Sequence, residues 1–120
     1  MSQEFTGSDA LYVSWKIDTA DEISARRVSL QLRRGEDQNL YRLRSWVIAG
    51  GEARALLAPV APLERIAEAI WDRPADAIFT QWIDSPDVCA RLARDIETAP
   101  VSMGLAKRPE QWPFSSAASD

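Results

Sequence analysis

The clearest pattern in the chain is a strict alternation of apolar and polar residues over residues 11–17. A period of two predicts a β-strand with one apolar face. Residues 40–48 and 53–60 are two further β-rich runs, and the Gly50-Gly51 pair between them predicts a tight turn, because glycine tolerates the positive φ angles of hairpins. Residues 77–83 form a fourth β-rich run. The sequence therefore predicts four strands, of which the second and third form a hairpin.

Helix signals begin directly after the first strand. Thr19 followed by Glu22 has the spacing of a capping box, in which each side chain satisfies a backbone N–H group at the helix start. We expect this helix to run to Arg34 and to end before Gly35, because glycine favours the position that follows a helix. The apolar residues expected on its buried face are Ile23, Val28, Leu30 and Leu32.

Two later segments also carry helix signals. Pro62 suits the first turn of a helix, and apolar residues follow it at the spacing of an amphipathic helix that Pro74 bounds. Ser85 and Pro86 form a cap and first-turn pair for another helix, which we expect Pro100 to end. The expected inward-facing residues of these two helices are Leu63, Ile66, Ala67, Ile70, Val88, Leu92 and Ile96.

The predicted elements follow the order strand, helix, strand, strand, helix, strand, helix. This order matches the ferredoxin-like split βαβ fold of the α+β class, an antiparallel sheet with its helices on one face. A C-terminal helix and an extended tail are added here. We expect a flexible N-terminus at residues 1–10, one domain at residues 11–106, and a tail at residues 107–120 that packs on the domain through Trp112 and Phe114.

Composition narrows the possible chemistry. The chain of 120 residues has no histidine and one cysteine, Cys89. Histidine-dependent triads, Cys-His pairs, histidine metal clusters and an intramolecular disulfide are therefore excluded. A single cysteine fits a reducing compartment, and residues 1–9 lack the basic start and apolar run of a secretory signal. Because the sequence also lacks the run of about 20 apolar residues that a membrane span needs, we expect a soluble cytoplasmic protein.

The charge of the chain is unevenly distributed. The formal net charge is −4, with 14 basic and 18 acidic residues, which argues against strong sequence-independent attraction to nucleic-acid phosphates. Residues 23–54 nevertheless hold more arginines than acids, and this block predicts a basic face on an acidic body unless its charges are scattered over a solvated surface. The arginines of the block are Arg26, Arg27, Arg33, Arg34, Arg42, Arg44 and Arg54.

The C-terminal part of the chain carries a longer signature. Residues 99–117, APVSMGLAKRPEQWPFSSA, resemble the closing motif of REP-associated tyrosine transposases, NPVRAGLVxRPEDWPWSSA. Residues 82–97, 41–59 and 12–17 are similar to the helix, hairpin and first strand that precede this motif in the family. The resemblance covers about residues 11 to 118. It implies a bacterial member of this transposase family with a ferredoxin-like sheet, in agreement with the order of the predicted elements.

The resemblance also implies what the chain lacks. In the family, two histidines on the third strand hold a divalent metal that polarises a DNA phosphodiester, and a tyrosine attacks that phosphodiester. The positions that match the histidines hold Glu52 and Arg54, and the position that matches the tyrosine holds Ile78. A guanidinium has no lone pair for a metal, and an isoleucine side chain is no nucleophile. The resemblance therefore implies a degenerate, catalytically inactive member with no metal and no other cofactor.

The first function that remains open is a DNA-binding or regulatory module for hairpin or single-stranded DNA, with weak, salt-sensitive binding. On an alternating strand, Arg42 and Arg44 share a face with Trp46, a mixture of guanidinium and aromatic groups that suits phosphates and a stacked base. The alternative for Trp46 is packing in the core. The other expected binding residues are Arg26, Arg27, Arg33 and Arg34.

Two further functions remain open. One is a protein-interaction or accessory-subunit module, a monomer or homodimer, because the chain has five tryptophans and tryptophan often anchors protein interfaces. The alternative for these tryptophans is a role as core and tail anchors. The other is an enzyme that uses an acid pair, Glu64 with Glu68 or Asp84 with Asp87, although a solvated surface is the ordinary explanation for such pairs.

Overall fold

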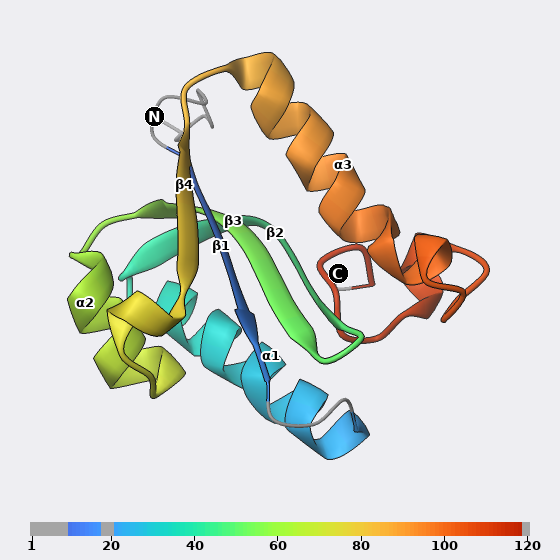
Figure 1. Ribbon diagram of the computed structural model, residues 1–120, viewed down its shortest axis with the longest axis horizontal. Helices are drawn as coiled ribbons and strands as arrows, with labels where there is room; N and C mark the ends of the chain where they lie inside the picture. Colours follow the sequence, from blue (N-terminus) through green and yellow to red (C-terminus); the bar gives the residue numbers. More distant parts are fainter. Residues whose placement is uncertain (1–9, 18–20, 119–120) are drawn as a thin grey trace.

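Four strands form one antiparallel sheet (Figure 1). Because side chains alternate along each strand, the sheet has two different faces. The computed structural model of the protein describes residues 10–17 and 21–118. The strands are β1 (Ala10–Lys16), β2 (Tyr41–Ala49), β3 (Glu52–Pro59) and β4 (Phe79–Ile83). Their order in the sheet is β2-β3-β1-β4, and every neighbouring pair is antiparallel.

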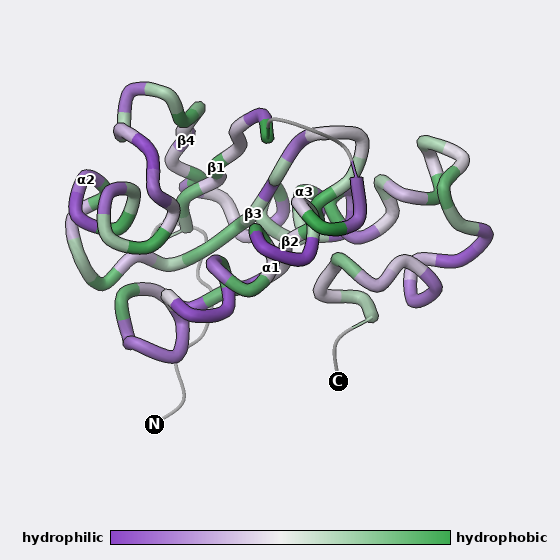
Figure 2. Tube along the Cα trace, turned by 90° about the horizontal axis from the view of Figure 1, so that it is seen from below, coloured by the Kyte–Doolittle hydropathy of each residue, from purple (hydrophilic) through white to green (hydrophobic). Residues whose placement is uncertain are grey.

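Helices cover both faces of the sheet. They are α1 (Glu22–Asp37), α2 (Leu63–Ile66), the π-helical turn η1 (Ala67–Trp71), the 3₁₀ turn η2 (Ala75–Ala77), α3 (Pro86–Ser102) and the 3₁₀ turn η3 (Pro109–Gln111). On one face, α1, α2 and η1 bury the odd-numbered residues of β1 and β3 in the larger core cluster. On the other face, α3 forms a smaller core cluster with the sheet. Hydrophobic residues accordingly run along the strands, and hydrophilic residues gather on helices and loops (Figure 2).

The predicted fold class is confirmed. The long elements follow the order β1, α1, β2, β3, α2, β4, α3, which is the predicted order. A β2-β3-β1-β4 sheet with α1 and α2 on one face is the split βαβ arrangement of the ferredoxin-like fold. The predicted turn is also confirmed, because Gly50 and Gly51 join β2 to β3 with φ angles of 62° and 78°. No helix in the described part of the chain is long and apolar enough to cross a membrane.

Helix α1 differs from the prediction at both ends. Asp21 is the N-cap and accepts a hydrogen bond from the backbone N–H of Ser24 at 2.7 Å, while the predicted cap Thr19 lies outside the described residues. The prediction that the helix ends before Gly35 is wrong, because the helix continues to Asp37. Gly35 instead makes room for the side chain of Tyr41. A Cβ atom at this position would lie 2.3 Å from the ring of Tyr41, so only glycine lets this ring pack directly on the helix.

The buried face of α1 is narrower than the sequence predicts. Val28 and Leu32 are buried against the sheet as expected. The prediction that Ile23 and Leu30 are buried is wrong, since these residues are 74% and 59% exposed. The rotation of 3.6 residues per turn brings Ile23 and Leu30 to the side of α1 that faces away from the sheet.

The second predicted helix is shorter and less regular than expected. It consists of one α-helical turn, α2, followed by the π-helical turn η1. This geometry buries the neighbouring residues Ile70 and Trp71 together with Ile66 and Ala67. Asp72 then ends η1 in a left-handed conformation with φ 56°. Aspartate is one of the few residues besides glycine that adopt this conformation at modest cost.

Helix α3 begins as predicted and ends later. Ser85 caps it by accepting a hydrogen bond from the Val88 backbone N–H at 3.3 Å, and Pro86 lies in the first turn. The prediction that Pro100 ends the helix is wrong, because the helix continues to Ser102. Pro100 has no N–H donor, so the helix forgoes the hydrogen bond that would run from residue 100 to the Ile96 carbonyl, and it ends two residues later. The Pro100 ring is fully buried.

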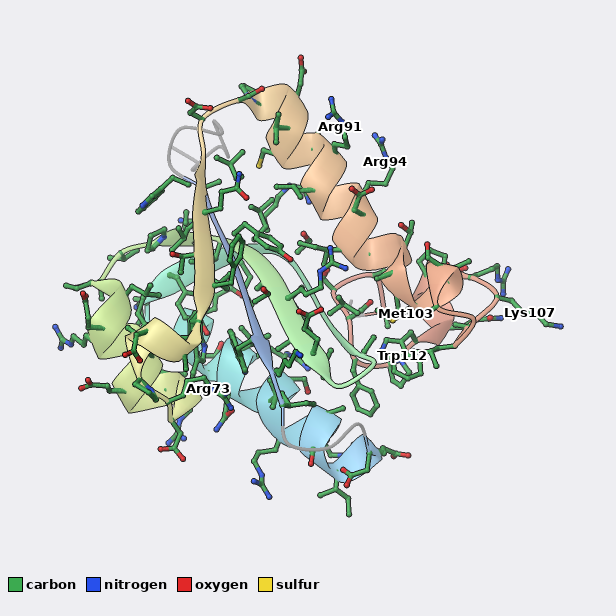
Figure 3. All side chains as sticks on the ribbon, in the orientation of Figure 1. Arg73, Arg91, Arg94, Met103, Lys107 and Trp112 are labelled. Atoms are coloured by element: carbon green, nitrogen blue, oxygen red, sulfur yellow. The ribbon has the colours of Figure 1, made fainter. Side chains whose placement is uncertain are left out.

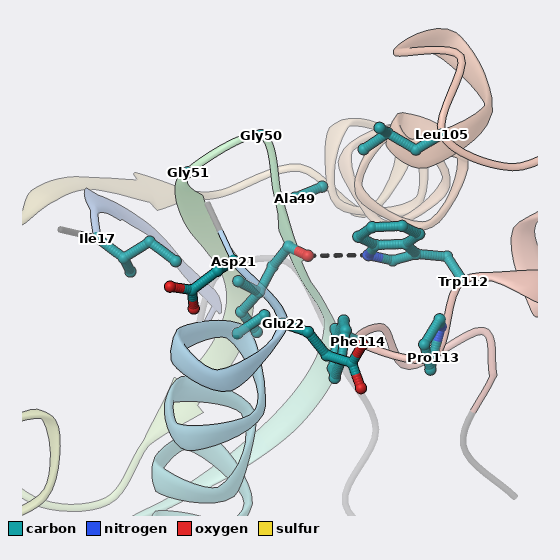
Figure 4. A pocket seen from close by; sticks show the side chains of 12 residues that line it. Ile17, Asp21, Glu22, Ala49, Gly50, Gly51, Leu105, Trp112, Pro113 and Phe114 are labelled. Atoms are coloured by element: carbon teal, nitrogen blue, oxygen red, sulfur yellow. Dashed lines mark hydrogen bonds between the residues drawn. The ribbon is translucent and has the colours of Figure 1, made fainter. Parts of the chain in front are cut away.

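The chain after α3 folds back along the outer edge of β2. The backbone N–H of Ile48 donates to the Phe114 carbonyl at 2.9 Å, and that of Ser116 donates to the Trp46 carbonyl at 2.9 Å. The Trp112 indole donates to the Ile48 carbonyl at 2.8 Å, beside an apolar hollow of about 270 Å³ (Figure 4). These hydrogen bonds satisfy backbone groups at a sheet edge that would otherwise be unpaired.

Tyr41 joins α1 to η1 inside the larger core cluster. Its hydroxyl donates to the Leu32 carbonyl and accepts a hydrogen bond from the Trp71 indole at 3.1 Å. Burial raises the pKa of the Tyr41 phenol far above its ordinary value, although the bond from Trp71 acts in the opposite direction. Because the pKa is higher in the folded than in the unfolded chain, the neutral phenol stabilises the fold fully below about pH 10 and less as the pH rises further.

We expect the Tyr41→Phe variant to lack this alkaline loss of stability. The free energies of unfolding of the wild type and the variant are measured in urea between about pH 8 and about pH 11. The excess stability of the wild type over the variant should shrink above about pH 10, the pKa of an exposed tyrosine. The variant itself is the control for every other group that titrates in this range. A free-energy difference between the two proteins that stays constant with pH would contradict the role of Tyr41.

Candidate nucleic-acid interface

The sheet face that carries α3 is only partly covered. The helix packs over Val47, Ala49 and Leu56 of β2 and β3, and over Ala10 and Ile83 at one end of β1 and β4. The remaining part of this face lies on β1, β4 and the start of β3, beside α3 (Figure 1). We call it the open face. The residues that share this part of the face are Tyr12, Ser14, Lys16, Glu52, Arg54, Phe79 and Gln81. Ser14 is buried between its neighbours, and Tyr12 is partly buried against the smaller core cluster.

Strand register arranges the open face in rows. In one row, Ser14 of β1 lies between Arg54 of β3 and Phe79 of β4. In the adjacent row, Tyr12 of β1 lies opposite Gln81 of β4. Opposed residues on antiparallel strands have Cβ atoms about 4.5–5.5 Å apart. A guanidinium, two aromatic rings and an amide therefore lie within reach of one ligand.

Two rings and a guanidinium form the centre of the open face. The rings of Tyr12 and Phe79 make an edge-to-face contact, with centroids 6.0 Å apart and an interplanar angle of 69°. Arg54 Nε donates a hydrogen bond to the Tyr12 hydroxyl at 3.1 Å, which holds the guanidinium beside the rings. Phe79 is 57% exposed, so its ring is accessible to a ligand. Aromatic rings on an open sheet are surfaces on which unpaired bases stack.

A hollow of about 250 Å³ lies between Arg54 and the C-terminal half of α3. The helix lines it with Asp95, Thr98, Ala99, Ser102 and Met103. Carboxylate and hydroxyl groups therefore face the guanidinium across this hollow. It gives the open face a polar rim on the side of α3.

The charges around the open face nearly balance. Lys16 and Arg54 are its cations, and Lys16 is exposed. Glu52 lies opposite Lys16 in the β1–β3 register. Arg91 and Arg94 project from the outer side of α3 and add no charge to the open face (Figure 3). Attraction of an anionic ligand to this surface therefore rests on few cations.

The structure brings together two of the three positions that the family resemblance singles out. Glu52 and Arg54 both lie on the open face. They do not fit a divalent cation, because the Arg54 guanidinium donates to Tyr12 and repels positive charge. No cluster of three or more potential metal ligands occurs among the described residues. Ile78 is buried in the larger core cluster, on the opposite face of the sheet from Glu52 and Arg54.

The prediction that Arg42 and Arg44 share a strand face with Trp46 is wrong. A β-bulge inserts Arg44 as an extra residue in β2, and such an insertion reverses the alternation of the residues that follow. Trp46 and Ile48 therefore face α1 and are buried in the larger core cluster, while Arg42 is exposed. The alternative prediction for Trp46, packing in the core, is confirmed. Trp46 cannot stack a base.

The other arginines of the basic block lie on both sides of the sheet. Arg44 lies near Cys89 of α3, where its charge opposes the rise in the pKa of the thiol that burial causes. The four arginines of α1 are exposed in the opposite layer: Arg26, Arg27, Arg33 and Arg34. One of them, Arg26, forms an ion pair with Glu22 at 2.9 Å. The structure thus distributes the block over both faces instead of forming one groove.

The tryptophans and acid pairs lie apart from the open face. Trp15, Trp46 and Trp71 are buried in the core, and Trp112 of the tail is partly buried against the larger core cluster. Trp82 is 62% exposed on β4, on the face opposite to that of Phe79. The carboxylates of the two acid pairs are exposed on α2, on η1, in the loop before α3 and in the first turn of α3: Glu64, Glu68, Asp84 and Asp87.

Sequence reasoning missed Tyr12 and Phe79 as candidate site residues. A signal for Tyr12 exists, since it is an aromatic residue on the polar side of the alternating strand at residues 11–17. No such signal exists for Phe79, because the run at residues 77–83 does not alternate. Only the pairing of β4 with β1 shows that Phe79 shares a face with Tyr12.

One solved structure has a fold similar to that of this chain. It is a REP-associated tyrosine transposase bound to a REP hairpin, and it matches with a TM-score of 0.75. The match covers 100% of this chain and 83% of that chain, at 11% sequence identity. At this identity the likeness shows a shared fold. No protein-family model and no curated protein sequence matches the chain.

Proposed function

We propose that the chain is a DNA-binding module that holds unpaired bases of a hairpin or single strand on its open face and does not cleave the strand. The observation that carries the proposal is the exposed ring of Phe79 beside Tyr12 and Arg54. The fold supports it, because the similar transposase structure is bound to a REP hairpin. The absence of cleavage is inferred from Glu52 and Arg54, which do not fit a divalent cation.

The chemistry of the open face suits an unpaired base next to a phosphate. A base stacks on an exposed ring whatever its identity, because every base has a π face. One N–H group of the Arg54 guanidinium donates to the Tyr12 hydroxyl. Its other N–H groups can donate to a phosphate oxygen. A paired base shows its edges and not its face, so this surface favours an unpaired segment over a duplex.

Salt dependence tests which cations contact the DNA. Each phosphate contact with a single strand contributes about −0.7 to the slope of log K against log salt concentration. Two cations, Lys16 and Arg54, therefore predict a slope of about −1.4, whereas contacts by all arginines of the basic block would give about −5. Fluorescence anisotropy of a labelled hairpin with a single-stranded extension measures this slope.

A pair of variants on β4 tests the surface itself. Phe79→Ala should weaken DNA binding by about 1–3 kcal/mol, at least about fivefold in Kd, because a stacked base loses its ring. Trp82→Ala is the matched control, since Trp82 is exposed to a similar degree on the opposite face of the same strand. Equal losses in both variants, or no binding by the wild type at about 50 mM salt, would refute the proposal.

A protein-interaction module is the second candidate, favoured by the exposed Trp82. This residue lies on β4, which forms an edge of the sheet. An exposed strand edge can pair with a strand of another chain, and an exposed tryptophan can anchor the contact. Sedimentation velocity of wild type and Trp82→Ala tests the homodimeric form of this candidate. A wild-type dimer that dissociates in the variant would support it, and a monomeric wild type would exclude it.

A further inference from the structure

A second polar hollow lies on the α1 side of the sheet, away from the open face. It has a volume of about 170 Å³ and lies between α1 and the end of η1. Pockets for drug-sized ligands measure about 300–1,000 Å³, so this one admits only a small ligand or one group of a larger ligand. The residues that determine its chemistry are Arg27, Gln31, Asp72 and Arg73.

Arg73 is held in a fixed position at this hollow. Its Nη1 donates to the Lys16 carbonyl at 3.1 Å, and its Nε donates to the Trp71 carbonyl at 3.4 Å. The guanidinium carbon lies 5.4 Å from the centre of the Trp15 ring, within the range of a cation–π contact. A guanidinium has five N–H donors, so these two hydrogen bonds leave others for a ligand. Figure 3 shows Arg73 where η1 meets α1.

An irregular backbone brings Arg73 to this place. The π-helical turn η1 ends at Asp72, whose φ of 56° turns the chain, and the Arg73 backbone N–H donates to the Ala67 carbonyl at 3.1 Å. Isolated π turns are uncommon and occur frequently at functional sites. The left-handed conformation of Asp72 is a second uncommon feature next to the same hollow.

Helix α1 supplies the opposite wall. Arg27 and Gln31 are four residues apart, so their side chains lie next to each other on one flank of the helix. The ion pairs of the described residues are Arg26–Glu22 and Arg108–Glu110, so neither Arg27 nor Arg73 has a carboxylate partner within this part of the chain. Two guanidinium groups and an amide therefore converge on a hollow whose described lining contains one carboxylate, that of Asp72.

We propose that this hollow binds a phosphate group. Guanidinium groups form strong, directional hydrogen bonds with phosphate oxygens, and two of them balance its negative charge. The Asp72 carboxylate has the complementary role, since it accepts a hydrogen bond from the proton that inorganic phosphate keeps near neutral pH. Sulfate has no such proton near neutral pH, so its negatively charged oxygens would repel the Asp72 carboxylate. The site therefore prefers phosphate to sulfate.

The test is a titration with inorganic phosphate at constant ionic strength, followed by ¹H–¹⁵N NMR spectra. The Nε–H signals of Arg27 and Arg73 and the indole signal of Trp71 should shift together and saturate in the millimolar range. Arg27→Gln should weaken binding about tenfold, because a charge-assisted hydrogen bond is lost. Arg27 is exposed, so the variant is expected to fold.

Arg33→Gln is the matched control, because Arg33 is also exposed on α1 and the substitution changes the charge equally. It should alter the dissociation constant less than about twofold, since exposed charges that are not in contact are largely screened. Equal effects of Arg27→Gln and Arg33→Gln would overturn the proposal. So would sulfate binding as tight as phosphate binding, or shifts that do not saturate.

The source of the phosphate group is decided by two further ligands. A single-stranded tetranucleotide with a 5′-phosphate is compared with the same tetranucleotide that ends in a 5′-hydroxyl, at about pH 6, where about half of the phosphate monoester keeps the proton that Asp72 accepts. Tighter binding of the phosphorylated strand at the Arg73 signals assigns the site to a nucleic-acid end. Saturable binding of inorganic phosphate alone assigns it to the free ion. The Phe79→Ala variant tests whether the hollow and the open face bind independently. It should weaken DNA binding at the open face and leave the responses of the Arg73 signals to both ligands unchanged.

Discussion

Replacement of Trp71 with alanine is expected to lower the free energy of unfolding by about 3–5 kcal/mol, the usual cost for a fully buried aromatic residue. The Trp71 ring lies 4.7 Å from the ring of Trp15 and 5.6 Å from that of Tyr41, between centroids. Truncation leaves a cavity where α1, β1 and η1 meet, and it removes the indole that donates to the Tyr41 hydroxyl. Because a domain of this size is stable by only about 5–15 kcal/mol, a large part of its stability would be lost.

Urea unfolding followed by circular dichroism measures this change. Trp82→Ala is the control for the loss of an indole, because Trp82 is largely exposed, and it should cost less than about 1 kcal/mol. Trp71→Phe should fall between the two, since it keeps most of the ring volume and loses the N–H donor. Similar stabilities of the Trp71→Ala and Trp82→Ala variants would show that Trp71 does not join α1, β1 and η1 as described.

Gly35→Ala is expected to lower the free energy of unfolding by about 1–3 kcal/mol, the usual cost of an overpacked core. Helix propensity alone predicts the opposite sign, since alanine is favoured over glycine inside a helix by about 0.8–1 kcal/mol. The added Cβ would lie 2.3 Å from two atoms of the Tyr41 side chain, much closer than van der Waals contact. Tyr41 cannot move aside freely, because its hydroxyl is bonded to Leu32 and Trp71.

A double-mutant cycle with Tyr41→Leu separates the two effects. If the clash determines the cost, Gly35→Ala should become neutral or stabilising in the Tyr41→Leu background, because the ring that it meets is gone. Coupling energies between residues in contact are about 0.5–3 kcal/mol. Additive effects of the two substitutions would show that Gly35 has another role in α1.

The alternating pattern at residues 11–17 predicts both that β1 is a strand and which of its two faces is buried. It identifies the buried face of β1 through Leu11, Val13 and Trp15, all of which lie in the larger core cluster. The opposite face, with Tyr12 and Lys16, becomes part of the open face. Local alternation suffices here because the strand has no bulge and each side chain keeps its face.

The same reasoning fails in β2 for a physical reason. One extra residue, Arg44, changes the register between Leu43 and Ser45 and sends Trp46 to the face opposite to the one predicted. Backbone pairing with β3 places this bulge, and nothing in the local composition of β2 indicates it. A prediction from periodicity alone therefore gave Trp46 a role in binding that its burial excludes.

Gly35 and Pro100 show the same limit for helix ends. Both residues are typical of helix termini, yet both lie inside their helices. Position 35 is a glycine inside α1 because a Cβ there would overlap the ring of Tyr41. Tertiary packing decides such cases, since the preferences that favour termination are about 1 kcal/mol for glycine and are outweighed by core contacts.

By itself, the sequence determined the order of strands and helices, the hairpin at Gly50-Gly51 and the ferredoxin-like fold class, because periodicity and turn residues are local signals. The tertiary structure decided which side chains meet. It brought Phe79 of β4 beside Tyr12 of β1, separated Ile78 from the open face, and placed Arg73 opposite Arg27 across a hollow. These neighbours come from distant parts of the chain, and only strand register and helix packing bring them together.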